Sequence, residues 1–206
     1  MCQVVSPGHT MLWGQRVDRG KRGRPFELRK GSVGEWLSAD RNEAKIYCSS
    51  EHTGVSPRKT MFAGRLLETI PLLKFLGYYL SEGSLMDGSR ISIHQEKHFD
   101  QMLFDIRTLF VAEGYREHGK IHVKMGSDLI SELRKFGHSH EKYIPEFIFD
   151  LSPDLIKVFL DAYALGDGSR KETGSKFFGY VAEEVTFCTS SMRMRDGLVE
   201  LLIPLS

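Results

Sequence analysis

Two apolar runs in the second two thirds of the chain share one pattern of hydrophobic and small positions. They cover residues 75–83 and 160–168, and their closing glycines are 85 positions apart (168 − 83). Pro71 and Pro153 precede the runs, and proline is well placed in the first turn of a helix. A glycine at the end of an apolar run is typical of a helix terminus. The pattern therefore predicts two similar apolar helices, each ending at an acidic residue and a glycine.

Small residues form a stripe on each predicted helix. Gly77 and Ser81 are four positions apart, and so are Ala162 and Gly166. Residues four apart lie on the same face of a helix. Two stripes without bulky side chains allow two helix backbones to approach closely. These four residues are therefore predicted to form a helix–helix interface.

Each predicted helix ends in a carboxylate, Glu82 in the first and Asp167 in the second. The C-terminal end of a helix carries partial negative charge, so an acid is disfavoured there. Either acid alone is more simply a solvated residue beside a turn. Two acids at matched positions favour a shared divalent cation, and oxygen ligands with an incomplete protein cage suit Mg²⁺.

The segments after the two runs also have corresponding patterns. Residues 90–95 alternate as a strand, 99–110 carry helical spacing up to Gly114, and a hairpin around Gly119 leads to a strand at 121–125 and a further helix. After Gly168 we expect strands near 176–181 and 185–189, and then a helix. The fold class is therefore α+β, with an order of helix, two strands, helix, two strands, helix that breaks off in the second copy.

The repeated phrase resembles the LAGLIDADG (DOD-type) motif of homing endonucleases. Gly77 and Ala162 match its small third position, and Glu82 and Asp167 match its acidic eighth position. Leu80 and Leu165 occupy the sixth position of the motif. This position is an aspartate in the motif that gives the family its name, and it is variable. The resemblance implies two pseudo-twofold-related αββαββα units in one monomer, at 63–150 and, truncated, at 151–206.

In that family the eighth-position acids bind the metals that cleave both DNA strands, so Glu82 and Asp167 would be catalytic metal ligands for Mg²⁺. A lysine and a glutamine on the strands often organise water near the metals, and Lys124 and Gln95 lie at roughly comparable places. The resemblance thus implies Mg²⁺-dependent, site-specific hydrolysis of double-stranded DNA.

Strand alternation predicts one apolar face and one polar, partly basic face. The polar positions expected to contact DNA are Arg90, His94, Lys120, His122, Lys124, Arg170 and Lys176. An ordinary solvated sheet face has the same alternation, and the family resemblance is what favours DNA. The formal net charge is only +1, so positive charge must be segregated on that face.

The first 62 residues have a different pattern and predict a small β-rich segment with a linker near 47–59. Ser6 and His9 resemble the Thr-x-x-His block of the splicing domain of inteins. In that family the His assists the first acyl shift. Only five residues precede the block, and a terminal His-Asn pair is missing, so splicing would require partner fragments.

Composition sets the remaining expectations. Three cysteines without a zinc or disulfide pattern favour a reduced, cytoplasmic setting, and no signal peptide or membrane span is expected. The main prediction is an intein-associated homing endonuclease. The alternatives are a DNA-binding remnant that no longer cuts, and splicing together with missing partner segments.

Overall fold

The computed structural model describes residues 10–16, 26–32, 44–47, 54–86, 89–175 and 180–202. The chain divides into two compact units, Met1–His52 with Val199–Ser206, and Thr53–Leu198. Helices and antiparallel sheets are mixed, which confirms the α+β class. Ser6, His9 and Lys176 lie outside the described residues.

The N-terminal unit contains a three-stranded antiparallel sheet in the order β2-β1-β3. Its strands are β1 (Thr10–Arg16), β2 (Phe26–Ser32) and β3 (Ala44–Tyr47). Leu12 in β1 lies opposite both Lys30 and Tyr47. This segment is therefore β-structured wherever it is described.

The larger unit begins with a hairpin of β4 (Lys59–Phe62) and β5 (Arg65–Glu68). The elements that follow are α2 (Thr69–Glu82), β6 (Gly83–Leu85), β7 (Arg90–His94), α3 (Phe99–Arg107), β8 (Val111–Tyr115), the 3₁₀ turn η1 (Arg116–His118), β9 (Lys120–Lys124) and α4 (Ser127–Arg134). Their strands form one antiparallel sheet in the order β6-β7-β9-β8.

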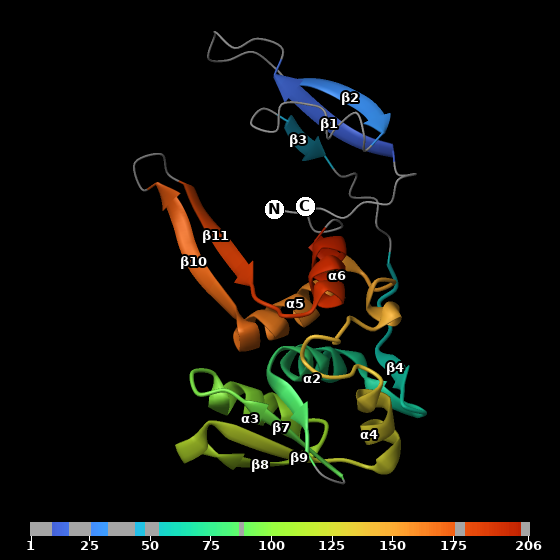
Figure 1. Ribbon diagram of the computed structural model, residues 1–206, viewed down its shortest axis with the longest axis vertical. Coiled ribbons are helices and arrows are strands. Elements are labelled where there is room, and N and C mark those ends of the chain that lie inside the picture. Colours follow the sequence, from blue (N-terminus) through green and yellow to red (C-terminus); the bar gives the residue numbers. More distant parts are fainter. Residues whose placement is uncertain are drawn as a thin grey trace. The chain divides into compact units, whose positions relative to one another are not determined.

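A second series starts after the 3₁₀ turn η2 (Glu146–Ile148). It consists of α5 (Pro153–Asp167), β10 (Gly168–Ser175), β11 (Tyr180–Phe187) and α6 (Met192–Leu202). The order helix, strand, strand, helix is the same as in α2, β6, β7 and α3. Both predicted apolar helices are confirmed, and each ends at its acidic residue (Figure 1).

The core forms where α2 packs against α5, the most extensive helix–helix contact among the described elements. Leu73 and Leu76 from α2 and Ile156 and Phe159 from α5 are fully buried. Full burial of such a side chain contributes about 1.5–3 kcal/mol. This core holds the two helix ends together. None of the described helices is both long and apolar enough to cross a bilayer.

The predicted alternation along β7 and β9 is confirmed. Ile91 and Ile93 are buried, as are Ile121 and Val123, while the residues at both ends of each strand are exposed. Facing residues pair in register, with Ile93 opposite Ile121 and His94 opposite Lys120. The sheet therefore has one apolar face and one polar face, as the sequence indicates.

Two local predictions were wrong. Helix α3 ends at Arg107 rather than near Gly114, because residues 111–115 pair with β9 as strand β8. The strand expected near 176–181 is displaced, because β10 begins at Gly168 directly after the helix. The polar sequence of β10 has no alternation that would reveal it, and pairing with β11 makes it a strand.

Part of the predicted linker is also anchored. The amide of Val55 donates to the carbonyl of Asp150 at 2.8 Å, and the amide of Ser152 donates to the carbonyl of Val55 at 2.9 Å. These two bonds place the chain before β4 alongside the start of α5. Such pairing between distant segments cannot be read from a Ser- and Gly-rich composition.

Candidate functional site

The stripe of small residues lets α2 and α5 approach until their backbones touch. A Cβ atom at position 77 would lie 2.7 Å from the Cβ of Ala162, 2.8 Å from the amide nitrogen of Tyr163 and 2.9 Å from the carbonyl oxygen of Phe159. Cβ atoms essentially never approach other heavy atoms below 3.0 Å. Gly77 and Ala162 therefore lie at the interface.

The same close approach occurs one turn later, beside the acids. A Cβ at position 166 would lie 2.0 Å from the Ser81 hydroxyl oxygen and 3.1 Å from the Cγ of Glu82. Ser81 bonds back to its own helix, since its hydroxyl donates to the Gly77 carbonyl at 2.9 Å. The four predicted interface residues thus meet, and they bring Glu82 next to the turn that carries Asp167.

The closing glycines are required for space and not for a left-handed conformation. Gly83 has φ −83° and Gly168 has φ −135°, which other residues adopt easily. A Cβ at position 83 would lie 2.5 Å from the Tyr79 carbonyl oxygen, and one at 168 would lie 2.8 Å from the Thr186 carbonyl oxygen. Glycine lets each strand leave its helix without a clash.

Glu82 and Asp167 are half-buried and interact electrostatically. Burial raises the pKa of Glu82, the charge of Asp167 raises it further, and His94 and Lys142 lower it. Burial also raises the pKa of Asp167, and Lys142 opposes this rise. A pair of partly desolvated, mutually repelling carboxylates favours a nearby positive charge.

The buried ammonium group of Lys142 supplies such a charge. The side chain is 5 % exposed, and its Nζ donates to the carbonyls of Tyr79 at 2.8 Å and Gly83 at 2.7 Å. Burial lowers its pKa to about 8, although Glu82 and Asp167 both act to raise it. Lys142 therefore caps the C-terminal end of α2 beside both acids.

The sequence reasoning missed Lys142. It lies between two helices, in a stretch with no regular period, and it reaches a helix that ends 60 residues earlier. Its one sequence signal is the apolar run that follows it, Tyr143, Ile144 and Pro145. A lysine beside such a run is often near the surface, so the signal is weak.

Gln95 caps the other helix. Its Nε2 donates to the carbonyls of Leu165 at 3.0 Å and Gly166 at 3.2 Å, and its Oε1 accepts from the amide of Lys97 at 3.0 Å. These bonds occupy the whole side-chain amide. Gln95 is thus next to Asp167, as a predicted site residue should be, and it holds the end of α5 in place.

Lys124 is not brought to the acids. Gly83 pairs with Ile93, and Ile93 pairs with Ile121, so the acidic end of α2 meets the start of β9. Lys124 lies at the other end of this strand, about 13 Å further along at about 3.3 Å per residue. The strand lysine at the acidic end is Lys120, which pairs with His94.

The predicted DNA-contacting residues that are described lie at exposed or half-buried positions. Arg90, His94, Lys120, Lys124 and Arg170 are exposed, and His122 is half-buried against the ring of Tyr115 at 4.8 Å between centroids. Arg170 forms an ion pair with Asp161 on α5. Arg170 belongs to the separate β10–β11 sheet, and the other five residues share the polar face of β7 and β9. Cations and ring donors on such a face are chemically suited to phosphates and base edges.

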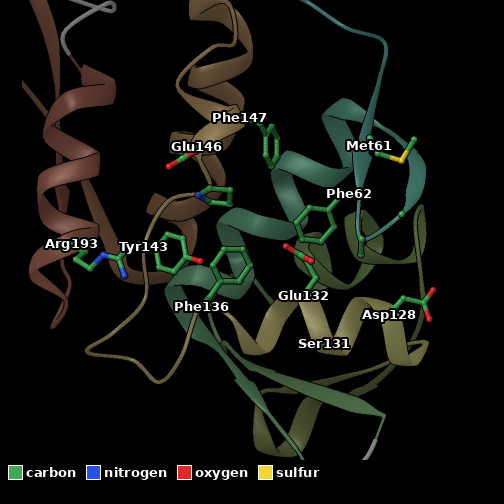
Figure 2. A pocket seen from close by; sticks show the side chains of 13 residues that line it. Met61, Phe62, Asp128, Ser131, Glu132, Phe136, Tyr143, Glu146, Phe147 and Arg193 are labelled. Carbon is green, nitrogen blue, oxygen red and sulfur yellow. The ribbon is translucent and has the colours of Figure 1, made fainter.

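A pocket of about 700 Å³, which neither Glu82 nor Asp167 lines, lies between the β4–β5 hairpin, α4 and the segment after Lys142 (Figure 2). Phe62, Phe136, Phe147 and Tyr143 form its aromatic wall, and Arg193 lies at its edge. The acidic residues at its rim are partly neutralised, since Asp128 pairs with Arg65 and Glu132 pairs with Lys135.

The described ranges contain no group of three or more His, Cys, Asp or Glu side chains able to form a protein-only metal cage. Two carboxylates are oxygen ligands of the type that a hard divalent cation takes, and such a cation would keep several water ligands. Comparison with known proteins adds no assignment: no family model matches the chain, and a search of curated proteins finds no match.

Proposed function

We propose that this protein is a site-specific DNA endonuclease of the LAGLIDADG kind, hydrolysing phosphodiester bonds with the help of Mg²⁺. The observation that carries the proposal is the meeting of Glu82 and Asp167 at the ends of two closely packed helices, with the buried ammonium of Lys142 beside them. The matched order of elements after α2 and α5 supports two related halves.

Glu82 and Asp167 would hold the cation, because both are half-buried, both carry raised pKa values, and the charge of Asp167 acts on Glu82. A bound Mg²⁺ supplies Lewis-acid activation of water and stabilises the developing charge on a phosphate oxygen. The acids keep their places because Lys142 and Gln95 cap the helix ends that carry them.

Lys142 has a further role in charge balance. A phosphodiester adds negative charge to a site that already contains two carboxylates, and this repulsion would oppose binding. The Lys142 ammonium is buried and is fixed by its bonds to the carbonyls of Tyr79 and Gly83. It therefore offsets negative charge at the site from a fixed position.

Double-stranded DNA would lie along the polar face of the β6-β7-β9-β8 sheet. The exposed cations at both ends of β7 and β9 supply phosphate contacts, and His122 and Tyr115 lie between them. The resemblance of the N-terminal segment to inteins remains a sequence prediction, because Ser6 and His9 are not among the described residues.

The proposal is tested with purified protein and a pool of supercoiled plasmids carrying randomised inserts. After incubation with Mg²⁺, double-strand ends are captured and sequenced. We expect ends concentrated at one sequence and dependent on Mg²⁺. Loss of a residue from the outer shell of a metal site costs up to about 100-fold in activity. Glu82→Gln and Asp167→Asn should each reduce the cleavage rate by more than this.

Both variants should still bind the selected DNA, measured by fluorescence anisotropy in Ca²⁺. Matched controls are Glu200→Gln and Asp154→Asn, which change exposed acids of the same types. Full cleavage by either Glu82→Gln or Asp167→Asn would contradict the assigned roles. DNA binding without cleavage by the unmodified chain would identify a DNA-binding protein instead.

A further inference from the structure

Ser191 links helix α6 to the backbone of Lys142. The Ser191 side chain is 1 % exposed, and its hydroxyl donates to the Lys142 carbonyl at 2.6 Å. The same oxygen accepts from the amide of Met194 at 3.2 Å, which makes Ser191 the N-cap of α6. One buried hydroxyl therefore both starts the helix and fixes the lysine's main chain.

A second contact joins the same two segments. The guanidinium of Arg193, two residues after Ser191, lies 4.2 Å from the centre of the Tyr143 ring, and Tyr143 packs edge-on against Phe136 at 5.2 Å. Figure 2 shows Arg193 beside Tyr143. The segment at 142–143 is therefore held by Ser191 and Arg193 on one side and by Phe136, shortly after α4, on the other.

Lys142 consequently spans two parts of the fold. Its carbonyl is bonded to Ser191, its amide donates to the His138 carbonyl at 3.1 Å, and its Nζ reaches the end of α2. The ammonium can stay between the helix end and the acids only while the main chain stays where α6 holds it. A lysine side chain that is no longer held in this way regains the freedom of its many rotamers.

We propose that Ser191 is a positioning residue, which through its bond to the Lys142 carbonyl keeps the Lys142 ammonium beside Glu82 and Asp167. The catalytic meaning of this role rests on the endonuclease function proposed above, whereas the positioning itself does not. Helix α6 of the second half thereby controls a charge that serves both acids.

Three variants separate positioning from helix capping. Ser191→Thr keeps a hydroxyl that can donate and accept. Ser191→Gly removes the hydroxyl but leaves a residue that is almost as good an N-cap, whereas Ser191→Ala removes both functions. Ser190→Ala is the matched control, because Ser190 is the exposed neighbour of Ser191.

The first measurement needs neither DNA nor metal. Lysines of the folded protein are acetylated with acetic anhydride, and the rate at each lysine is followed by mass spectrometry. Lys142 should react slowly in the unmodified chain, in Ser191→Thr and in Ser190→Ala. It should react at least about 10-fold faster in Ser191→Gly and in Ser191→Ala.

Lys74 is the internal reference, because its side chain is partly exposed and paired with Asp105 at 2.8 Å, far from α6 in the sequence. An equal acceleration at Lys74 would mean general loosening and would overturn the proposal. An unchanged rate at Lys142 in Ser191→Gly would overturn it as well. Neither result depends on whether the protein cuts DNA.

The second measurement uses the DNA selected in the cleavage experiment. Ser191→Gly should lower the single-turnover cleavage rate about 10-fold and leave the Kd for DNA unchanged, and Ser191→Thr should restore the rate. A larger Kd with an unchanged rate would assign Ser191 to DNA binding and overturn the positioning role. Absence of cleavage by the unmodified chain would contradict the endonuclease function alone.

Discussion

Helices α2 and α5 end in the same way, but different groups cap them. At α2 the charged Lys142 donates to the last carbonyls, and at α5 the neutral amide of Gln95 does so. The strands that pair with the two closing glycines differ too. Gly83 pairs with Ile93, which is followed by His94, and Gly168 pairs with Phe187, which is followed by Cys188. Similar backbones therefore carry unequal electrostatics.

This difference shows how a repeated sequence produces an asymmetric site. The backbone repeat places two carboxylates at matching helix ends, and side chains from one half supply both caps. His94 and Lys142 accordingly both lower the pKa of Glu82, whereas Lys142 lowers that of Asp167. The two acids are therefore expected to respond unequally when neighbouring charges are removed.

Enlarging the helix interface should have the largest effect on stability. Gly77→Val would force a side chain against the backbone of α5. We expect it to lower the free energy of unfolding by about 3 kcal/mol, which is at the upper end of the usual cost of an overpacked core. The measurement is urea unfolding followed by circular dichroism. A loss below about 0.5 kcal/mol would mean that the helices do not pack this closely.

Gly197→Ala is the matched control within a helix. A Cβ at position 197 would meet the ends of the Ile144 and Phe149 side chains at 3.1–3.4 Å, and these can move slightly. Alanine also favours the helix over glycine by about 1 kcal/mol. This variant should therefore be as stable as the unmodified chain or slightly more stable.

The buried Lys142 should give stability a dependence on pH. Its pKa is about 8 in the folded protein, against an ordinary value of 10.5. Between these pH values the unfolded chain binds more protons, so the free energy of unfolding should rise with pH there, by at most about 1.4 kcal/mol per unit. Below pH 8 both states hold the proton, and the dependence should disappear.

Lys142→Met should remove this rise, and Lys135→Met, which changes an exposed lysine, should leave it in place. Denaturant unfolding at a series of pH values from 7 to about 11 measures both slopes. Equal slopes for the unmodified chain and Lys142→Met would show that the Lys142 amine is not desolvated as described.

The smallest expected effect is on the pKa of Glu82. It is tested by changing His94 and Cys188, which follow the strand partners of Gly83 and Gly168. The charge of His94 lowers the pKa of Glu82, so His94→Ala should raise the Glu82 pKa in metal-free buffer. Cys188→Ala should leave it unchanged, because the shift of the Glu82 pKa comes from burial, Asp167, His94 and Lys142. Carbon-13 NMR titration of the Glu82 carboxyl measures the shift. A fall in the Glu82 pKa on removing His94 would contradict the described arrangement.

Local sequence patterns were sufficient for the helices and for the inward faces of β7 and β9. Proline near each start, apolar runs and closing glycines predicted α2 and α5, and the period of two predicted which side chains are buried. The same patterns were insufficient for β10, whose residues have no apolar alternation, and for β8, which lies in the stretch up to Gly114 that the spacing had assigned to the helix. Pairing with a distant strand decided both.

The sequence alone determined that two small-residue stripes and two acids stand at matching helix positions, because these features depend on neighbours within a few residues. The tertiary structure decided which side chains surround the acids. Lys142 reaches a carbonyl 63 positions earlier, and Gln95 reaches one 70 positions later. Such contacts form only when the chain packs, since hydrophobic burial brings the segments together and buried carbonyls must then find donors.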